Sequence, residues 1–263
     1  MRYSIFIWPS TELFLTEVGT WLADALRIQG HEVVWGLDLS GCIIAIGANA
    51  SRHHHVSLPA TAIVLNLEQL YEGSPWLTPE YLTVLRTYSV WDYNTHNQSF
   101  LGSLGIFSKK ISIGYAPSMG DRALVKKDID VLFYGCLNDR RHALQSKLPG
   151  VVVFRNCNLW NEERRELVAR SKIILNVHYY PTALFEIVRV APVLAQGGFV
   201  ITEVSRDQED YSDLQIGMVV CRYEEIVEKV KYYLANDRDR ESVSARGYDL
   251  IRERPFTVPY FGL

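Results

Sequence analysis

The chain has 263 residues, of which 48% are hydrophobic and 22% are charged. These fractions are ordinary for a globular protein and exclude a disordered chain. The 27 Lys and Arg residues against 30 Asp and Glu residues give a formal net charge of −3, which excludes the strong overall positive charge that drives unspecific binding to nucleic acid.

Hydropathy and cysteine usage indicate the cellular compartment in which the protein is expected. No apolar run approaches the roughly 20 residues that cross a bilayer, and the opening apolar run at residues 3–8 is too short for a signal peptide and is followed by Pro9. The 4 cysteines form no C-x-x-C pair, so we expect them to pack in the core rather than to form disulfides or bind zinc. We therefore expect a cytoplasmic protein without a membrane span.

The first half alternates short β-branched or aromatic runs with segments of helical periodicity, which is typical of parallel sheets with crossover helices. A first helix carries Phe14, Val18 and Leu22 on one face and ends at Gly30. Further helices are expected at residues 79–85 and 95–104. The expected strands are residues 3–8, 32–35, 42–46, 62–67, 88–91 and 110–113.

The second half repeats this alternation after residues 114–127, which lack apolar periodicity and mark a domain boundary. The expected strands are residues 129–134, 151–154, 172–177, 199–202 and 218–221. The expected helices are residues 139–148, 160–170, 182–196, 223–235 and 237–254.

The predicted architecture is α/β with two Rossmann-like parallel-sheet domains. We expect an N-terminal domain at residues 1–118, a linker at 119–128 and a second domain at 129–250. The helical C-terminus crosses back, and a tail at 251–263 packs on the first domain. Because open parallel sheets bind ligands at the carboxyl ends of their strands, the two sheets are expected to face a cleft.

Familiar nucleotide and hydrolase motifs are missing: the sequence contains no G-x-G-x-x-G after the first strand, no P-loop and no G-x-S-x-G. The turn after residues 129–134 is more informative, since Gly135 precedes Arg140, Arg141 and the start of a helix. A tight backbone turn, free N–H groups and fixed positive charge would suit a diphosphate. An ordinary turn with two surface arginines explains the same residues equally well.

The strand at residues 172–177 leads into polar and aromatic residues, including Asn176, His178 and Tyr180. The next predicted helix carries Glu186 and Arg189 one turn apart among apolar neighbours. Two charges in a helix of this type need each other or a ligand, and we favour ligand contact over a surface ion pair.

Four stretches together resemble the donor-binding domain of GT-B glycosyltransferases, in particular their short bacterial and phage-type members related to families 1 and 4. They are residues 130–135 with the two arginines, residues 175–178, the pattern Phe185-Glu186-x-x-Arg189, and residues 194–203. The resemblance covers about residues 128–236. It implies that the second domain binds a nucleotide-diphosphate sugar as co-substrate, with no other cofactor, and that the first domain binds the acceptor.

The resemblance also implies individual roles. Gly135 and either Arg140 or Arg141 would face the diphosphate, Glu186 would lie near the ribose hydroxyls, and Arg189 would contact a phosphate or orient Glu186. The full set of predicted donor-binding residues is Gly135, Asn138, Arg140, Arg141, Asn176, His178, Tyr180, Glu186, Arg189 and Glu203.

One departure from the family pattern affects this assignment. Many retaining members carry two glutamates eight positions apart, but Leu194 stands eight positions after Glu186, and the next acid is Glu203. Either Glu186 or Glu203 can therefore be the residue that meets the ribose, and the stereochemical outcome stays open.

No D-x-D motif stands at the end of a strand, so we expect no metal site, with arginines and backbone N–H groups neutralising the leaving diphosphate. The run Arg52-His53-His54-His55 favours a polar loop over a metal site, because consecutive histidines in a strand point to alternate faces.

An acceptor hydroxyl needs a general base, and the first half offers several candidates. We favour Asp92, which ends a strand between Trp91 and Tyr93, and Glu12, which follows the first strand. Glu68 and His96 are further options. The alternative interpretations are an N-terminal helix charge for Glu12 and a turn or cap residue for Asp92.

The leading hypothesis is a metal-independent glycosyltransferase that moves a hexosyl or pentosyl group from a nucleotide-diphosphate donor to an acceptor that the sequence does not identify. One alternative is an enzyme of the same kind acting on modified bases of phage DNA. Another is a non-catalytic module that only binds the nucleotide sugar.

Overall fold

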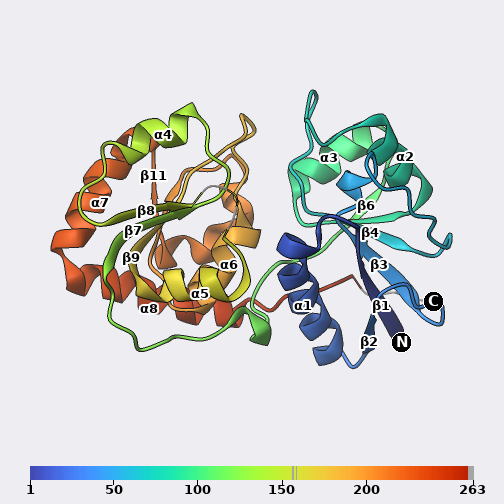
Figure 1. The fold of residues 1–263 in the computed structure, drawn as a ribbon, viewed down its shortest axis with the longest axis horizontal. Coiled ribbons are helices and arrows are strands. Elements are labelled where there is room, and N and C mark those ends of the chain that lie inside the picture. The colour runs from blue at the N-terminus through green and yellow to red at the C-terminus, as the bar shows by residue number, and fades with distance from the viewer. Residues whose placement is uncertain (156, 158, 260–263) are drawn as a thin grey trace. The chain divides into compact units, whose positions relative to one another are not determined.

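The computed structural model describes residues 1–155, 157 and 159–259. The chain divides into two compact units (Figure 1), of which unit 1 comprises residues 1–118 together with the C-terminal residues from Pro255, and unit 2 comprises Met119–Arg254. Each unit contains one sheet of parallel strands with flanking helices. The predicted α/β class is confirmed.

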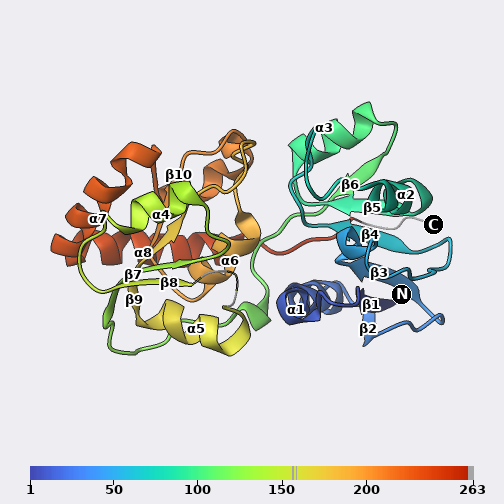
Figure 2. The same ribbon diagram turned by 45° about the horizontal axis from the view of Figure 1, so that its top comes forward.

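Unit 1 is built on a six-stranded sheet with the order β2-β1-β3-β4-β5-β6. Its strands are β1 (Arg2–Ile7), β2 (Glu32–Trp35), β3 (Cys42–Ile46), β4 (Ile63–Asn66), β5 (Ser89–Asp92) and β6 (Ser108–Lys110), and its helices are α1 (Glu12–Ile28), α2 (Pro79–Thr87) and α3 (Thr95–Ser103). Figure 2 shows α1 on one face of the sheet and α2 and α3 on the other.

The helices of unit 1 begin where the sequence supplies capping groups. The Thr78 hydroxyl accepts a hydrogen bond from the backbone N–H of Tyr81 at 3.2 Å, and Pro79 occupies the first position of α2, where its missing N–H has no cost. The Asn94 side chain caps α3 by accepting from the N–H of His96 at 2.8 Å. These caps fix α2 and α3 next to the carboxyl ends of β4 and β5.

Unit 2 has a five-stranded sheet with the order β11-β10-β9-β7-β8. Its strands are β7 (Ile129–Tyr134), β8 (Val152–Arg155), β9 (Ser171–Asn176), β10 (Val200–Glu203) and β11 (Val219–Cys221), and its helices are α4 (Asp139–Gln145), α5 (Asn161–Arg170), α6 (Ile187–Ala195), α7 (Ile226–Ala235) and α8 (Asp237–Glu253). Val131, Phe133 and Ile173 of the sheet pack with Ile226 and Val230 of α7 in one buried cluster.

The predicted helix at residues 182–196 is wrong in its first part, because α6 begins only at Ile187. Ala183 has a positive φ of 51°, which is incompatible with a right-handed helix. The backbone N–H of Phe185 donates to Asp207 Oδ1 at 2.8 Å instead of to a helical carbonyl. Glu186 therefore stands just before the helix rather than on its face.

The cysteine prediction is wrong for two of the four residues. Cys136 and Cys157 form a disulfide with a Cα–Cα distance of 4.7 Å, while Cys42 and Cys221 are free thiols. The two bonded residues lie 21 positions apart in sequence. They come together only because the parallel strands β7 and β8 end side by side.

The chain returns to unit 1 after α8. This helix ends at Glu253 and so includes the first residues of the tail expected at 251–263. The N–H of Phe256 donates to the carbonyl of Tyr115 at 3.0 Å, and the N–H of Thr257 donates to that of Ser112 at 2.9 Å. The expected packing of Tyr260 and Phe261 lies outside the described residues. Within the described ranges, the structure contains no helix with the length and apolar character that crossing a membrane requires.

Candidate functional site

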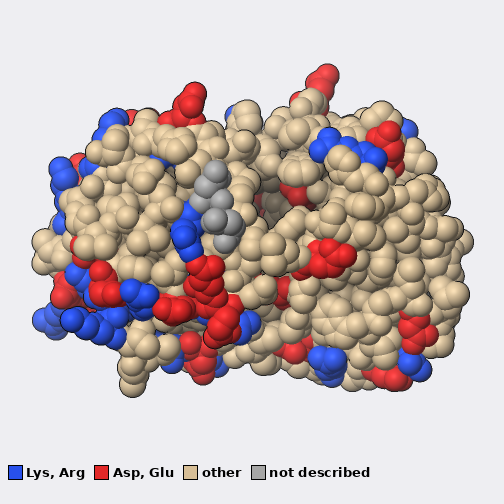
Figure 3. Space-filling model, viewed as in Figure 1, with Lys and Arg blue, Asp and Glu red and all other residues tan. Residues whose placement is uncertain are grey.

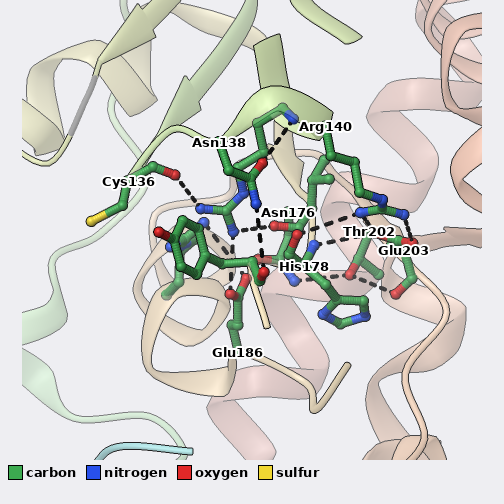
Figure 4. A network of polar contacts seen from close by, with 12 residues as sticks. Cys136, Asn138, Arg140, Asn176, His178, Glu186, Thr202 and Glu203 are labelled. Carbon is green, nitrogen blue, oxygen red and sulfur yellow. Dashed lines mark hydrogen bonds and ion pairs between the residues drawn. The ribbon is translucent and has the colours of Figure 1, made fainter. Parts of the chain in front are cut away.

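Polar side chains of unit 2 converge where β7, β9 and β10 end and α6 begins (Figure 4). The predicted donor-binding residues lie in this region. Gly135, Asn138, Arg140 and Arg141 follow β7; Asn176, His178 and Tyr180 end or follow β9; Glu203 ends β10; Glu186 and Arg189 stand at the start of α6. A parallel sheet places these segments at one edge, although they are far apart in sequence.

Arg140 is held by a carboxylate from the neighbouring strand end. Its Nη1 donates to Glu203 Oε2 at 2.8 Å, and its Nη2 donates to Glu203 Oε1. Its guanidinium also lies over the ring of Tyr223, 3.9 Å from the centroid. The hydrogen bonds to Glu203 raise the pKa of Arg140. Glu203 thus orients Arg140, whose side chain is 38% exposed, and contact of Arg140 with a diphosphate stays a prediction.

Arg141 lies underneath the turn and is only 1% exposed. Its Nη1 donates to the Cys136 carbonyl at 2.5 Å, and its Nη2 donates to the Val177 carbonyl and lies 3.4 Å from Glu186 Oε1. Burial lowers the pKa of Arg141 to about 10, so its guanidinium stays charged at neutral pH. Arg141 thus joins the ends of β7 and β9 to Glu186.

Asn138 has a local structural role at the start of α4. Its side-chain Oδ1 accepts from the backbone N–H of Arg141 at 3.0 Å, which caps the helix. Its Nδ2 donates to the Tyr179 carbonyl at 3.5 Å. Asn138 therefore fixes the turn between β7 and α4 against the segment that follows β9.

Arg189 lies directly on the backbone of the β7 turn. Gly135 has a φ of +131°, and a Cβ atom at this position would come within 2.7 Å of Arg189 Nη2. The positive φ favours glycine at this position, and the missing side chain leaves room for the Arg189 guanidinium. The Arg189 side chain is 19% exposed, and its Nη1 lies 3.6 Å from Glu186 Oε2.

Several buried polar atoms of this edge have no hydrogen-bond partner among the described residues. They are Asn176 Oδ1, His178 Nδ1, Glu186 Oε2, Arg189 Nη1 and Arg141 Nε. Buried polar groups in folded proteins are nearly always paired. A cluster of unpaired donors and acceptors at the carboxyl edge of a parallel sheet is the arrangement expected of a polar ligand site.

The remaining polar atoms of Asn176 and His178 form hydrogen bonds within the protein. Asn176 Nδ2 donates to Thr202 Oγ1 at 3.0 Å. The backbone N–H of His178 donates to Glu203 Oε2 at 3.1 Å, and its ring Nε2 lies 3.1 Å from the Val204 carbonyl. The orientation of both side chains is thereby set before any ligand binds.

Sequence reasoning missed two aromatic residues of this edge. Tyr223 supports Arg140 with its ring and donates from its hydroxyl to the Arg140 carbonyl at 2.6 Å. Tyr179 is 40% exposed, and its ring contacts that of Tyr180 edge-on with a centroid distance of 5.0 Å. Tyr179 stands between two predicted residues and could have been included, whereas Tyr223 carries no local signal.

The carboxyl edge of the unit 1 sheet contains the predicted base Asp92. Its carboxylate is fully buried and accepts from Asn66 Nδ2 at 2.7 Å, from Asn97 Nδ2 at 3.1 Å and from the N–H of Asn94 at 2.8 Å. Burial raises the pKa of Asp92 to about 7. The prediction that Asp92 takes a proton from an acceptor is at odds with this geometry, because the side chain is enclosed by its own hydrogen-bond donors.

The other carboxylates of this edge are more accessible. Glu12 is exposed in the first turn of α1. Glu68 is half-buried, its Oε1 accepts from Asn49 Nδ2 at 3.1 Å, and burial raises its pKa to about 7. The predicted polar loop Arg52–His55 is largely exposed, and no cluster of three potential metal ligands occurs among the described residues.

Sequence comparison places these features in a family. Residues 123–257, just over half of the chain, match the family described as glycosyl transferase-like. The chain belongs to the glycosyl transferase-like family. It is also 28% identical over 191 residues to the uncharacterized protein L140 of Acanthamoeba polyphaga mimivirus, a match that covers 66% of this chain and 59% of L140.

Solved structures show the fold of this glycosyl transferase-like chain. HepE of Anabaena, solved with UDP and glucose, matches with a TM-score of 0.66 at 11% identity over 97% of this chain and 96% of HepE. WaaG, a glycosyltransferase of lipopolysaccharide biosynthesis, matches with a TM-score of 0.59 at 13% identity over 96% and 95% of the two chains. The chain spans only 52% of TarM. Its two parallel sheets have the GT-B fold.

Proposed function

We propose that this protein is a metal-independent glycosyltransferase that takes its sugar from a nucleotide-diphosphate donor bound at the carboxyl edge of the unit 2 sheet. The observation that carries the proposal is the cluster of buried polar atoms without hydrogen-bond partners around Arg189 and Glu186, whose charged groups lie 3.6 Å apart. The family match supports it, as do structural neighbours solved with UDP or UDP-glucose.

Within this proposal, Arg189 binds the diphosphate. It is the arginine whose guanidinium lies on the Gly135 turn and whose Nη1 makes no hydrogen bond to a described residue, whereas Arg140 binds Glu203 and Arg141 binds backbone carbonyls. A fixed guanidinium and the nearby backbone N–H groups stabilise the negative charge that develops on the leaving diphosphate. No divalent metal is then required.

Glu186 is the residue that we assign to the ribose hydroxyls. Its Oε2 has no hydrogen-bond partner among the described residues, so a hydroxyl group can donate to it. Both oxygens of Glu203, in contrast, accept from Arg140, and one also accepts from the backbone of His178. Glu203 therefore orients its neighbours rather than contacting the ribose.

On the acceptor side, we assign the proton acceptor to Glu12 or Glu68 of unit 1. Glu12 is exposed in the first turn of α1. Glu68 is better suited to accept a proton at neutral pH, because burial raises its pKa to about 7 and Asn49 orients its Oε1. A sugar hydroxyl, another alcohol or a hydroxylated base could supply the proton.

DNA is the alternative acceptor that a comparison raises. An α-glucosyltransferase solved with UDP-glucose and DNA matches this chain with a TM-score of 0.58 at 10% identity. On the face shown in Figure 3, Lys and Arg side chains are interspersed with Asp and Glu. The formal net charge of −3 provides no overall attraction to DNA, so we favour a non-nucleic-acid acceptor.

A thermal-shift screen with UDP, ADP, GDP and UDP-glucose in excess EDTA tests the donor site. A ligand at 100 times its Kd stabilises the folded state by about 2.7 kcal/mol, so at least one nucleotide should raise the Tm clearly without metal. The absence of a shift with all four would contradict the donor site, and a shift that appears only with Mg²⁺ or Mn²⁺ would contradict metal independence.

Release of UDP from UDP-glucose then separates an enzyme from a binding module. Slow transfer of the sugar to water is expected of a glycosyltransferase whose acceptor is absent. Tight binding of UDP-glucose without any hydrolysis would favour the non-catalytic module.

A further inference from the structure

The Cys136–Cys157 disulfide joins two loops at the carboxyl edge of the unit 2 sheet. Cys136 stands two residues after β7, and Cys157 stands two residues after β8. The strands themselves pair in parallel up to Tyr134 and Arg155, and the N–H of Gly135 donates to the Arg155 carbonyl at 3.0 Å. The disulfide therefore extends the link between the two chain segments beyond the last hydrogen bond of the sheet.

The bonded cysteine is connected to the candidate donor site through its backbone. The Cys136 carbonyl accepts from Arg141 Nη1 at 2.5 Å, and the same guanidinium lies 3.4 Å from Glu186 Oε1. Figure 4 shows the Cys136 carbonyl directed into the polar network and its sulfur directed away from it. The sulfur can thus change its chemical state without leaving a gap in the site, while the carbonyl transmits the change to Arg141.

Two observations favour Cys136 and Cys157 over the free thiols as the site of redox chemistry. Cys136 is exposed and Cys157 is partly exposed, so a reductant can reach them. The free thiols are less suited to redox chemistry, since Cys221 is buried and burial raises its pKa to about 11, and burial also raises the pKa of Cys42. A thiol with a raised pKa forms little of the reactive thiolate.

We propose that the Cys136–Cys157 disulfide is a redox switch that controls donor affinity, with the oxidised form binding the nucleoside diphosphate more tightly. The inference rests on the proposed function. In the oxidised form the Cys136 carbonyl is held where Arg141 binds it, so that Arg141 and Glu186 are ordered before the ligand arrives. Reduction releases the turn, and binding must then order it.

The chemical step is a thiol–disulfide exchange. A dithiol such as dithiothreitol supplies two electrons and two protons, the Sγ–Sγ bond breaks, Cys136 and Cys157 become thiols, and the dithiol becomes a cyclic disulfide. Oxidised glutathione reverses the change: it takes the two electrons and two protons from the cysteine pair and leaves as two glutathione thiols.

Calorimetric titration of the full chain with UDP, ADP and GDP, before and after reduction by dithiothreitol, tests the switch. Peptide mass mapping without reductant verifies the state of the pair in each sample. Coupling between two sites in a protein commonly changes affinity about 5- to 150-fold, so we expect reduction to weaken binding at least about fivefold and reoxidation by glutathione disulfide to restore it.

Two variants complete the test. Cys42→Ser/Cys221→Ser keeps the pair and should keep the full response to dithiothreitol, while Cys136→Ser/Cys157→Ser should bind as weakly as the reduced wild-type chain and show no response. Equal affinity of the oxidised and reduced wild-type chains would overturn the switch and leave the proposed function intact. A failure of both forms to bind any of the three nucleotides would overturn the proposed function, and the switch with it.

Discussion

The two sheets of this protein end in polar clusters of similar composition but different completeness. At the edge of the unit 1 sheet, the Asp92 carboxylate is fully buried and accepts from Asn66, Asn94 and Asn97. At the edge of the unit 2 sheet, Glu186 Oε2 and Arg189 Nη1 are equally removed from solvent but have no hydrogen-bond partner among the described residues.

This difference in hydrogen bonding distinguishes a polar cluster that stabilises its own unit from one that is arranged to bind a ligand. Leaving a buried donor or acceptor unpaired costs about 1–3 kcal/mol. A network whose members satisfy one another makes the folded state more stable, as around Asp92. A network that keeps unpaired groups is less stable by itself and regains this energy when a polar ligand supplies the missing partners.

The largest expected effect tests the structural role of Asp92. Asp92→Ala leaves three buried donors unpaired, so the free energy of unfolding should fall by about 3–6 kcal/mol, as measured by urea denaturation. UDP affinity of the folded variant should not change. As a matched control, Asp38→Ala removes a partly exposed carboxylate that accepts from Arg2 and Ser40 and should change the unfolding free energy by less than about 1 kcal/mol. A loss at Asp92 no larger than that at Asp38 would contradict its structural role.

The next effect is the pH dependence of unit 1. Burial raises the pKa of Asp92 from 3.8 to about 7, so between these values the folded state binds more protons than the unfolded state. The resulting stabilisation is complete below about pH 4 and is lost as the pH rises through 7, with a total of up to about 4 kcal/mol.

Urea midpoints between pH 4.5 and pH 8 measure this dependence. The wild-type chain should lose stability with rising pH more steeply than Asp92→Asn, which cannot titrate at this position. Parallel pH profiles of the two proteins would show that the buried carboxyl has an ordinary pKa.

The smallest expected effect lies in unit 2 and concerns binding rather than folding. Arg189→Ala should weaken UDP binding by about 1–3 kcal/mol, since it removes a charge-assisted hydrogen bond to phosphate. The control Arg170→Ala removes a surface arginine of unit 2 that pairs with Asp128 and Glu166 and should leave UDP affinity unchanged. Equal affinities of the two variants, measured by calorimetry, would remove the distinction between the two clusters.

Much of the fold could be predicted because local patterns determine it. The strands at residues 42–46 and 129–134 have the predicted bounds and are mostly buried, because a continuous run of β-branched and aromatic residues is typical of a strand inside a parallel sheet. The edge strand at residues 32–35 also has the predicted bounds. The start of α6 could not be predicted from such patterns. It depends on a hydrogen bond between Phe185 and Asp207, which is separated from it by 22 residues and a strand.

The candidate site shows the same division. The sequence placed Gly135, Arg140, Arg141, Glu186, Arg189 and Glu203 at strand ends and helix starts, and the structure brings them to one edge. The sequence could not distinguish the roles of the three arginines. Arg140 is paired with Glu203, Arg141 is buried under the turn, and Arg189 alone of the three lies against Gly135, because these partners come from different strands.

The sequence by itself determined the class of this protein: alternating hydrophobic runs and helical segments give two α/β units, and residues at the ends of the strands suggest a nucleotide-sugar site. Only the tertiary structure decided which polar groups have their hydrogen bonds, as with Asp92, which groups lack them, as with Arg189 Nη1, and which cysteines form a disulfide. Hydrophobic periodicity is a property of neighbouring residues, whereas hydrogen-bond satisfaction and disulfide pairing depend on segments that only the folded chain brings together.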